Sequence, residues 1–117
     1  MTLDDFLKTL QAEPENVSFA QTMAVIEQYY QYTPSAFKNG RAENQAGTNE
    51  GSCKLFAFAK LQNLNEAQTL ACFGDYYRKD VLQNPSGSDH ANIRNFIVTG
   101  WQGLEFERSA ESILSTK

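Results

Sequence analysis

Residues 18–30 have the sequence Ser18-Phe19-Ala20-Gln21-Thr22-Met23-Ala24-Val25-Ile26-Glu27-Gln28-Tyr29-Tyr30. Ser18 and Gln21 have the spacing of a capping box, in which each side chain accepts a hydrogen bond from the backbone N–H of the other residue. Apolar side chains follow every three or four residues and so share one helical face: Phe19, Met23, Ile26 and Tyr30. This stretch predicts an amphipathic helix that packs on a core.

Four more helices are predicted on either side of it, over residues 2–13, 49–64, 65–83 and 88–100. Each begins with a residue type that caps helix N-termini: Thr2, Asn49, Asn65 and Ser88. Gly74 falls inside the fourth helix, where glycine costs about 1 kcal/mol relative to alanine. We therefore expect a close contact with another helix at Gly74. Gly100 fits the left-handed position that closes the fifth helix.

Extended structure is expected in only two places. Asn39-Gly40 is a strong turn signal inside the irregular segment 32–48 and can support a very short hairpin. Residues 101–106 alternate in polarity and can pair with residues 37–44. Residues 107–117 are polar, and we expect them to form a frayed helical tail. The fold class predicted is thus mainly α, with about five helices in one compact domain over residues 1–117 and at most a short two-stranded β element.

The amino-acid composition argues against several classes of binding partner. The chain has 117 residues, of which 41% are hydrophobic, and this is enough to bury a core without disulfides. The net charge of −4 arises entirely from residues 1–50, because the rest of the chain is neutral. The lack of a basic cluster argues against binding to nucleic acid or to an anionic membrane. No apolar run is long enough to span a membrane, and the N-terminus lacks the features of a signal peptide. One His and two Cys are too few for a zinc site, so we expect no metal and no cofactor.

Two polar segments contain most of the chemically reactive side chains, at the predicted starts of the third and fifth helices. They are Asn49-Glu50-Gly51-Ser52-Cys53-Lys54 and Ser88-Asp89-His90-Ala91-Asn92-Ile93-Arg94-Asn95-Phe96. Free N–H groups at helix N-termini attract anions. If the two starts meet, they predict a pocket for a small anion, with these ligand-binding residues: Glu50, Ser52, Lys54, His90, Arg94 and Asn95. The competing interpretation is a structural clasp, in which Arg94 pairs with Glu50 and is buried between the helices.

The same segments also allow a catalytic interpretation. Cys53 near a helix N-terminus could act as a nucleophile, with His90 as its base and Asp89 or Asn95 orienting the imidazole. The spacing of these residues matches no known protease signature. We therefore rank this small hydrolase or transferase below a protein that only binds.

Several motifs resemble those of the HopJ type III effector family. They follow one another along residues 18–106: Tyr30-Gln31-Tyr32-Thr33-Pro34, Phe37-Lys38-Asn39-Gly40, Asn49-Glu50-Gly51-Ser52-Cys53-Lys54, Phe73-Gly74-Asp75-Tyr76-Tyr77-Arg78, Asp89-His90-Ala91-Asn92-Ile93-Arg94-Asn95-Phe96 and Gly100-Trp101. The resemblance implies a small bacterial protein. The name of the family, by itself, also implies secretion into a host cell. It implies no catalytic residues.

The predicted N-terminal helix differs from the unfolded, Ser-rich segment that usually directs type III secretion, which favours the bacterial cytoplasm as the location. We expect a non-enzymatic, HopJ-like protein that binds a protein partner or a small anionic ligand. The alternative is the hydrolase or transferase that uses Cys53 and His90.

Overall fold

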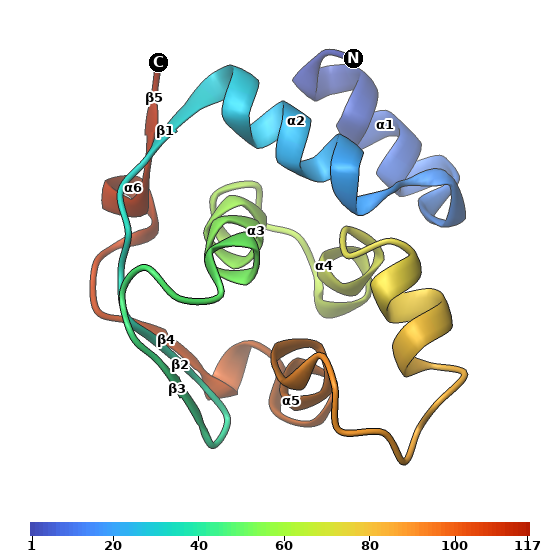
Figure 1. Cartoon of the computed structure of the whole chain (residues 1–117). Coiled ribbons are helices and arrows are strands. Elements are labelled where there is room, and N and C mark those ends of the chain that lie inside the picture. Colours follow the sequence, from blue (N-terminus) through green and yellow to red (C-terminus); the bar gives the residue numbers. More distant parts are fainter.

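Helix α3 (Glu50–Leu61) lies at the centre of the fold, with the other elements packed around it (Figure 1). The computed structural model describes residues 1–117. Cys53 and all residues of the run 55–59 are buried, so α3 is apolar on nearly every side. A helix of this kind is stable only inside a core.

The N-terminal third of the chain forms the two helices that the sequence predicts, α1 (Leu3–Ala12) and α2 (Phe19–Tyr29). A short 3-10 helix that was not predicted, η1 (Pro14–Asn16), lies between them. The Thr2 side chain accepts a hydrogen bond from the Asp5 N–H at 3.1 Å, and Ser18 and Gln21 form the expected capping box. These local signals are confirmed because each depends only on residues within one turn.

The helix predicted over residues 65–83 is wrong as a single element. The capping box of Asn65 and Gln68 does open α4 (Glu66–Ala71), but the chain then turns at Gly74 into the π-helix η2 (Tyr76–Val81). Gly74 has φ +63°, and a Cβ atom there would lie 2.7 Å from the backbone nitrogen of Phe19. The expected close contact at Gly74 exists, but Gly74 lies in the turn after α4 and not inside a helix.

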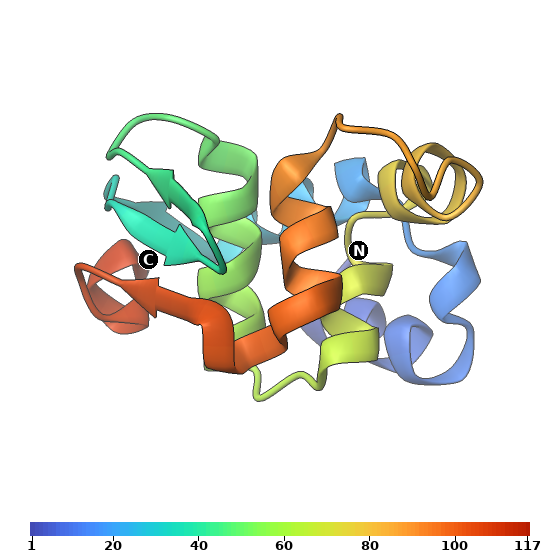
Figure 2. The ribbon, with the colours of Figure 1, turned by 90° about the horizontal axis from the view of Figure 1, so that it is seen from below.

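The fifth predicted helix starts two residues later than expected. Helix α5 (Ala91–Thr99) follows His90, not Ser88, and the 3-10 helix η3 (Gly100–Gly103) continues it. Figure 2 shows α3 and α5 side by side and running in the same direction, with their first turns at the same end. The rings of Phe56 and Phe96, 5.0 Å apart, join the two helices. No helix in the structure is long and apolar enough to cross a membrane.

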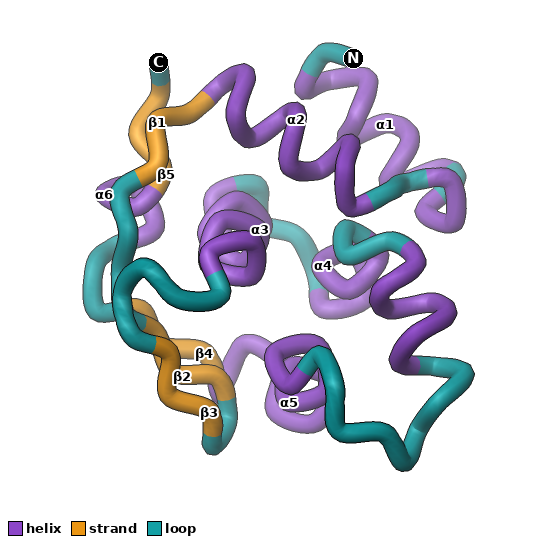
Figure 3. The backbone as a smooth tube through the Cα atoms, viewed as in Figure 1, coloured by secondary structure: helices purple, strands orange, loops and turns teal.

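Five short strands form two antiparallel sheets (Figure 3). One sheet pairs β1 (Tyr30–Tyr32) with β5 (Leu114–Thr116). The other has the order β3-β2-β4, from β2 (Phe37–Asn39), β3 (Ala42–Asn44) and β4 (Leu104–Phe106). Gly40, with φ +62°, makes the hairpin turn between β2 and β3, and the pairing of residues 104–106 with β2 is as expected.

The prediction of a mainly α fold with at most a two-stranded β element is therefore wrong, because the fold is α+β with two sheets. Each strand has only three residues, and β1 and β5 have no alternating pattern long enough to be recognised in the sequence. Residues 107–117, for which we expected a frayed tail, contain α6 (Ala110–Ile113) and β5. Ile113 and Leu114 are buried in the core, which holds this segment in place.

Candidate functional site

The first turns of α3 and α5 line one cavity of about 540 Å³, called here the α3–α5 pocket. Six lining residues come from the helix starts: Asn49, Gly51, Ser52, His90, Ala91 and Asn92. The rings of Phe19, Phe73 and Tyr76 form an aromatic wall, and strand β3 closes the remaining side. The two polar segments singled out in the sequence thus do meet.

The backbone at both helix starts is unusual. Asn49 (φ 48°) and His90 (φ 53°) occupy the N-cap positions in the left-handed conformation, and neither side chain caps its helix. The first helical hydrogen bonds run from the Cys53 N–H to Asn49 and from the Arg94 N–H to His90. The N–H groups of the preceding three residues in each helix therefore have no acceptor within the helix. Two sets of uncapped N–H groups open on one cavity.

A network of asparagine side chains holds the two helix starts against the β2–β3 hairpin. Asn92 donates from Nδ2 to Asn44 Oδ1 at 3.0 Å, and Asn49 donates to the same oxygen at 2.7 Å. Asn39 donates to the Asn92 backbone carbonyl at 2.8 Å. Asn39, Asn44 and Asn92 are all buried. Because buried amides are costly to leave unpaired, this network fixes the relative positions of hairpin, α3 and α5.

His90 lies at the rim of the pocket and is held by acidic groups. Its Nε2 is 3.0 Å from Asp80 Oδ2 and 3.8 Å from Asp89 Oδ2. The imidazole also packs on the ring of Tyr76, with the ring centroids 5.2 Å apart. These contacts fix the orientation of the imidazole. Ser52 is the other predicted ligand-binding residue that lines the pocket.

The remaining predicted ligand-binding residues lie elsewhere. Lys54 points away from the cavity, with its Nζ 4.8 Å above the ring of Tyr32. Glu50 and Asn95 are not part of the pocket wall. Spacing of four residues correctly predicts a shared helix face, but it does not indicate which face meets the cavity.

Arg94 forms a clasp with a different partner from the one predicted. Its Nη2 is 2.6 Å from Asp89 Oδ1, and its Nη1 donates to the Asn84 carbonyl at 2.8 Å. The predicted pairing of Arg94 with Glu50 is therefore wrong. The hydrogen bond from Arg94 lowers the pKa of Asp89 below its ordinary value. Arg94 thus closes the loop before α5.

Cys53 is placed as a core residue. Its side chain is fully buried, and its Sγ lies 3.7 Å from the Ser35 carbonyl oxygen. Burial raises the pKa of the Cys53 thiol. No hydrogen bond joins Cys53 to His90, which instead faces Asp80. This arrangement lacks the contact between nucleophile and base that covalent catalysis requires.

Sequence reasoning missed several residues of the pocket. Asn44 comes from the irregular segment. Phe19 was interpreted as part of the apolar face of a core-packing helix, and Tyr76 was not assigned to the predicted pocket. The abundance of asparagine near the two polar segments is the one available signal, since most buried side-chain amides form hydrogen bonds. No group of three or more His, Cys, Asp or Glu side chains lies close enough together to share a metal ion.

Comparison with known proteins is informative at the level of the family. The family model described as HopJ type III effector protein matches residues 3–111. The chain belongs to the HopJ family. A solved structure, described as "Crystal structure of unknown function protein VPA0580", is 53% identical in sequence, with a TM-score of 0.96. The match covers 100% of this chain and 95% of that one. No curated protein matches.

The whole α3–α5 pocket lies inside the HopJ match, since its lining runs from Phe19 to Ile93. The asparagine network that supports it, from Asn39 to Asn92, lies inside the match as well. All residues that line the pocket therefore lie within the matched range, residues 3–111.

Proposed function

We propose that this HopJ-family protein acts by binding, without catalysis, a small ligand that carries a carboxylate or phosphate group, and that the α3–α5 pocket is the binding site. One observation carries the proposal: two helix N-termini without side-chain caps line the same cavity. Uncapped N–H groups and the positive end of the helix dipole both favour an anion.

The carboxylates near the pocket do not strongly repel an anion bound there, because each has a basic neighbour. Asp89 is paired with Arg94, and Glu43 is 3.8 Å from Lys38. Asp80 is paired with His90, whose Nε2 is 3.0 Å from Asp80 Oδ2. An anion in the pocket would therefore interact mainly with backbone N–H groups, Ser52 and His90.

The aromatic wall suggests what the rest of the ligand is like. Phe19 packs on Tyr76 with ring centroids 5.2 Å apart and stacks on Phe73 at 6.2 Å. Aromatic faces that line a cavity favour an apolar or ring-containing group. The ligand class that fits is an anionic head attached to a small apolar body.

Nothing in the geometry favours the alternative, a hydrolase or transferase. A buried Cys53 with a raised thiol pKa is a poor nucleophile, and His90 is directed to Asp80. Asp89, one of the two residues proposed to orient the imidazole, accepts a hydrogen bond from Arg94. Binding without catalysis therefore remains the better-supported function.

Equilibrium dialysis with phenylacetate and acetate tests the proposal. We expect phenylacetate to bind with a dissociation constant of about 1 mM or tighter and acetate more weakly, because only phenylacetate reaches the aromatic wall. His90→Gln should weaken binding, whereas Lys54→Ala, which removes a cation on the other side of α3, should not. Equal losses in the two variants, or no saturable binding of either acid, would contradict the proposed site.

The description of the family, type III effector protein, suggests secretion into a host cell. Phe6 and Leu10 of α1 are buried, so passage through a secretion channel would require α1 to leave the core. Secretion of a reporter fused to residues 1–30 by a bacterium with a type III system would support delivery. Retention of the reporter would instead support the location predicted from the sequence, the bacterial cytoplasm.

A further inference from the structure

A second cavity, of about 460 Å³, shares the aromatic wall of the α3–α5 pocket and is called here the neighbouring cavity. Phe19, Phe73 and Tyr76 line both cavities, so their rings lie at the boundary between them. Phe19 is the middle ring of the three, since it stacks on Phe73 and meets Tyr76 edge to face. Phe73 is buried in the core and Tyr76 is exposed. The half-buried ring of Phe19 is therefore the one that separates the two cavities.

Two glycines hold Phe19 in this position, one at each end of the residue. A Cβ atom at Gly51, in the first turn of α3, would lie 2.9 Å from Cζ at the tip of the Phe19 ring. A Cβ atom at Gly74 would lie 2.7 Å from the Phe19 backbone nitrogen. Both distances are shorter than two such atoms can approach, so only glycine lets the ring and its backbone pack this closely. Phe19 is thus fixed directly beside one of the helix starts of the pocket.

The neighbouring cavity is a preformed space with fixed walls. Arg78, which lines it, donates hydrogen bonds to the backbone carbonyls of Pro14 at 3.2 Å and Val17 at 2.6 Å. These bonds hold the segment between α1 and α2 against η2. The carboxylates of Glu15 and Asp75 also line the cavity, which makes it unfavourable for a second anionic group. A neutral apolar group is the extension of a ligand that suits this space.

We propose that Phe19 is the specificity-determining residue of the α3–α5 pocket. Its ring restricts the ligand to an anionic head with a single-ring body, and a shorter side chain at this position would join the two cavities and admit a longer body. The inference rests on the function proposed above, because it concerns the ligand of the same pocket. Binding of a single-ring acid tests that function, whereas the preference between a short and a long acid tests the role of Phe19.

The test is equilibrium dialysis of the full chain with phenylacetate and with 4-biphenylacetate, which carries a second ring in line with the first. A second ring that is buried in the protein should tighten binding about tenfold. We expect the parent to bind 4-biphenylacetate no tighter than phenylacetate, because Phe19 denies the second ring a place. Phe19→Leu should bind 4-biphenylacetate at least about fivefold tighter than the parent does, and phenylacetate more weakly. The comparison within the parent does not depend on how well the variant folds.

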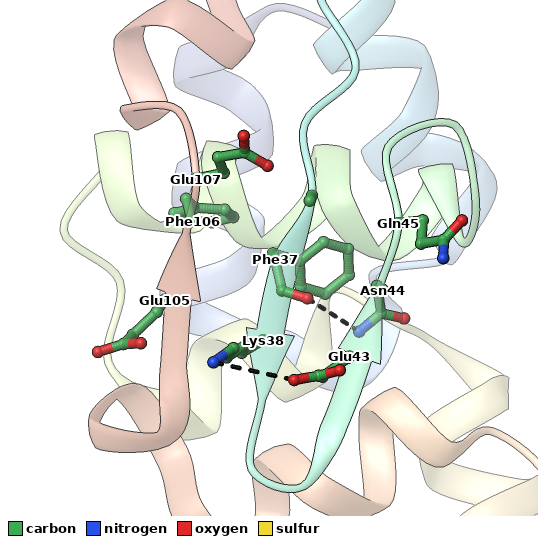
Figure 4. Close-up of a pocket in the computed structure, with 9 residues that line it drawn as sticks. Phe37, Lys38, Glu43, Asn44, Gln45, Glu105, Phe106 and Glu107 are labelled. Atoms are coloured by element: carbon green, nitrogen blue, oxygen red, sulfur yellow. Dashed lines mark hydrogen bonds and ion pairs between the residues drawn. The ribbon is translucent and has the colours of Figure 1, made fainter.

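Phe106→Leu is the matched control. Phe106 is also half-buried, but it lines a cavity beside the three-stranded sheet and neither of the two cavities that Phe19 separates (Figure 4). This variant should keep the preference of the parent. A parent that binds 4-biphenylacetate about tenfold tighter than phenylacetate, or an equal change of preference in both variants, would overturn the role of Phe19 alone. Absence of saturable phenylacetate binding to the parent would overturn the proposed function and this inference together.

Discussion

Asn44 and Asn92 hydrogen-bond each other through both ends of their side-chain amides. Asn92 Nδ2 donates to Asn44 Oδ1 at 3.0 Å, and Asn44 Nδ2 donates to Asn92 Oδ1 at 3.3 Å. The pair joins the end of β3 to the first turn of α5, and Asn49 extends it to the start of α3. The geometry of the α3–α5 pocket therefore depends on two buried amides from distant parts of the chain.

Replacing Asn92 with alanine should destabilise the protein by about 1–3 kcal/mol, because it leaves the amides of Asn39 and Asn44 buried with lost partners. Urea unfolding measures this change. Asn95→Ala, on the same helix but outside the network, should change the free energy of unfolding by no more than about 0.5 kcal/mol. Similar losses in both variants would show that the network contributes nothing particular.

Gly74→Ala should cost at least about 2 kcal/mol of stability, because it combines a left-handed backbone with a Cβ placed 2.7 Å from the Phe19 nitrogen. Gly47→Ala is the matched control. Gly47 also has a positive φ, but nothing lies within 4 Å of its added Cβ. We expect only the backbone penalty there, about 1 kcal/mol. Equal thermal stability of the two variants would argue against the close contact at Gly74.

Neither thiol should react readily in the folded protein. Cys53 and Cys72 are both fully buried, and burial raises the pKa of Cys53 and that of Cys72, the latter to about 12. A disulfide reagent at pH 7 should label two thiols per chain in denaturant and label the native protein much more slowly. Rapid labelling of native Cys53 below pH 7 would instead support its role as a catalytic nucleophile.

Asp89 should contribute to the loss of folding stability at acid pH. Its pKa is lowered in the folded state, first by the hydrogen bond from Arg94, so its contribution is present above the unfolded value of about 3.9 and is lost as pH falls through the lower folded value. Asp89→Asn should flatten the decline in stability below about pH 4. Glu27→Gln, which removes a carboxyl without an ion pair, should leave the decline unchanged when unfolding is followed across pH 2–6.

The sequence predicts local structure well where a signal is complete within one turn. The caps at Thr2, Ser18 and Asn65 are confirmed, since each joins residues three apart. The cap at Ser88 was wrong because His90 takes a left-handed conformation that a capping pattern does not reveal. Strands β1 and β5 were missed because they are short and pair across more than 80 residues, so no local pattern reports them.

The site was predictable only in its broad position. Two polar segments at helix starts indicated a shared pocket, and Ser52 and His90 do line one. Lys54 and Arg94 were assigned to it because they lie one turn farther along. Their actual directions depend on how each helix is rotated in the core, which is set by distant contacts such as Phe56 with Phe96.

The most direct test of the central claim, that two helix starts form one anion-binding pocket, is an NMR titration of the full chain with phenylacetate. The amide signals of Gly51, Ser52, Ala91 and Asn92 should shift together and give one common dissociation constant. Shifts at only one helix start, different dissociation constants at the two, or no saturable shift at either would contradict the claim.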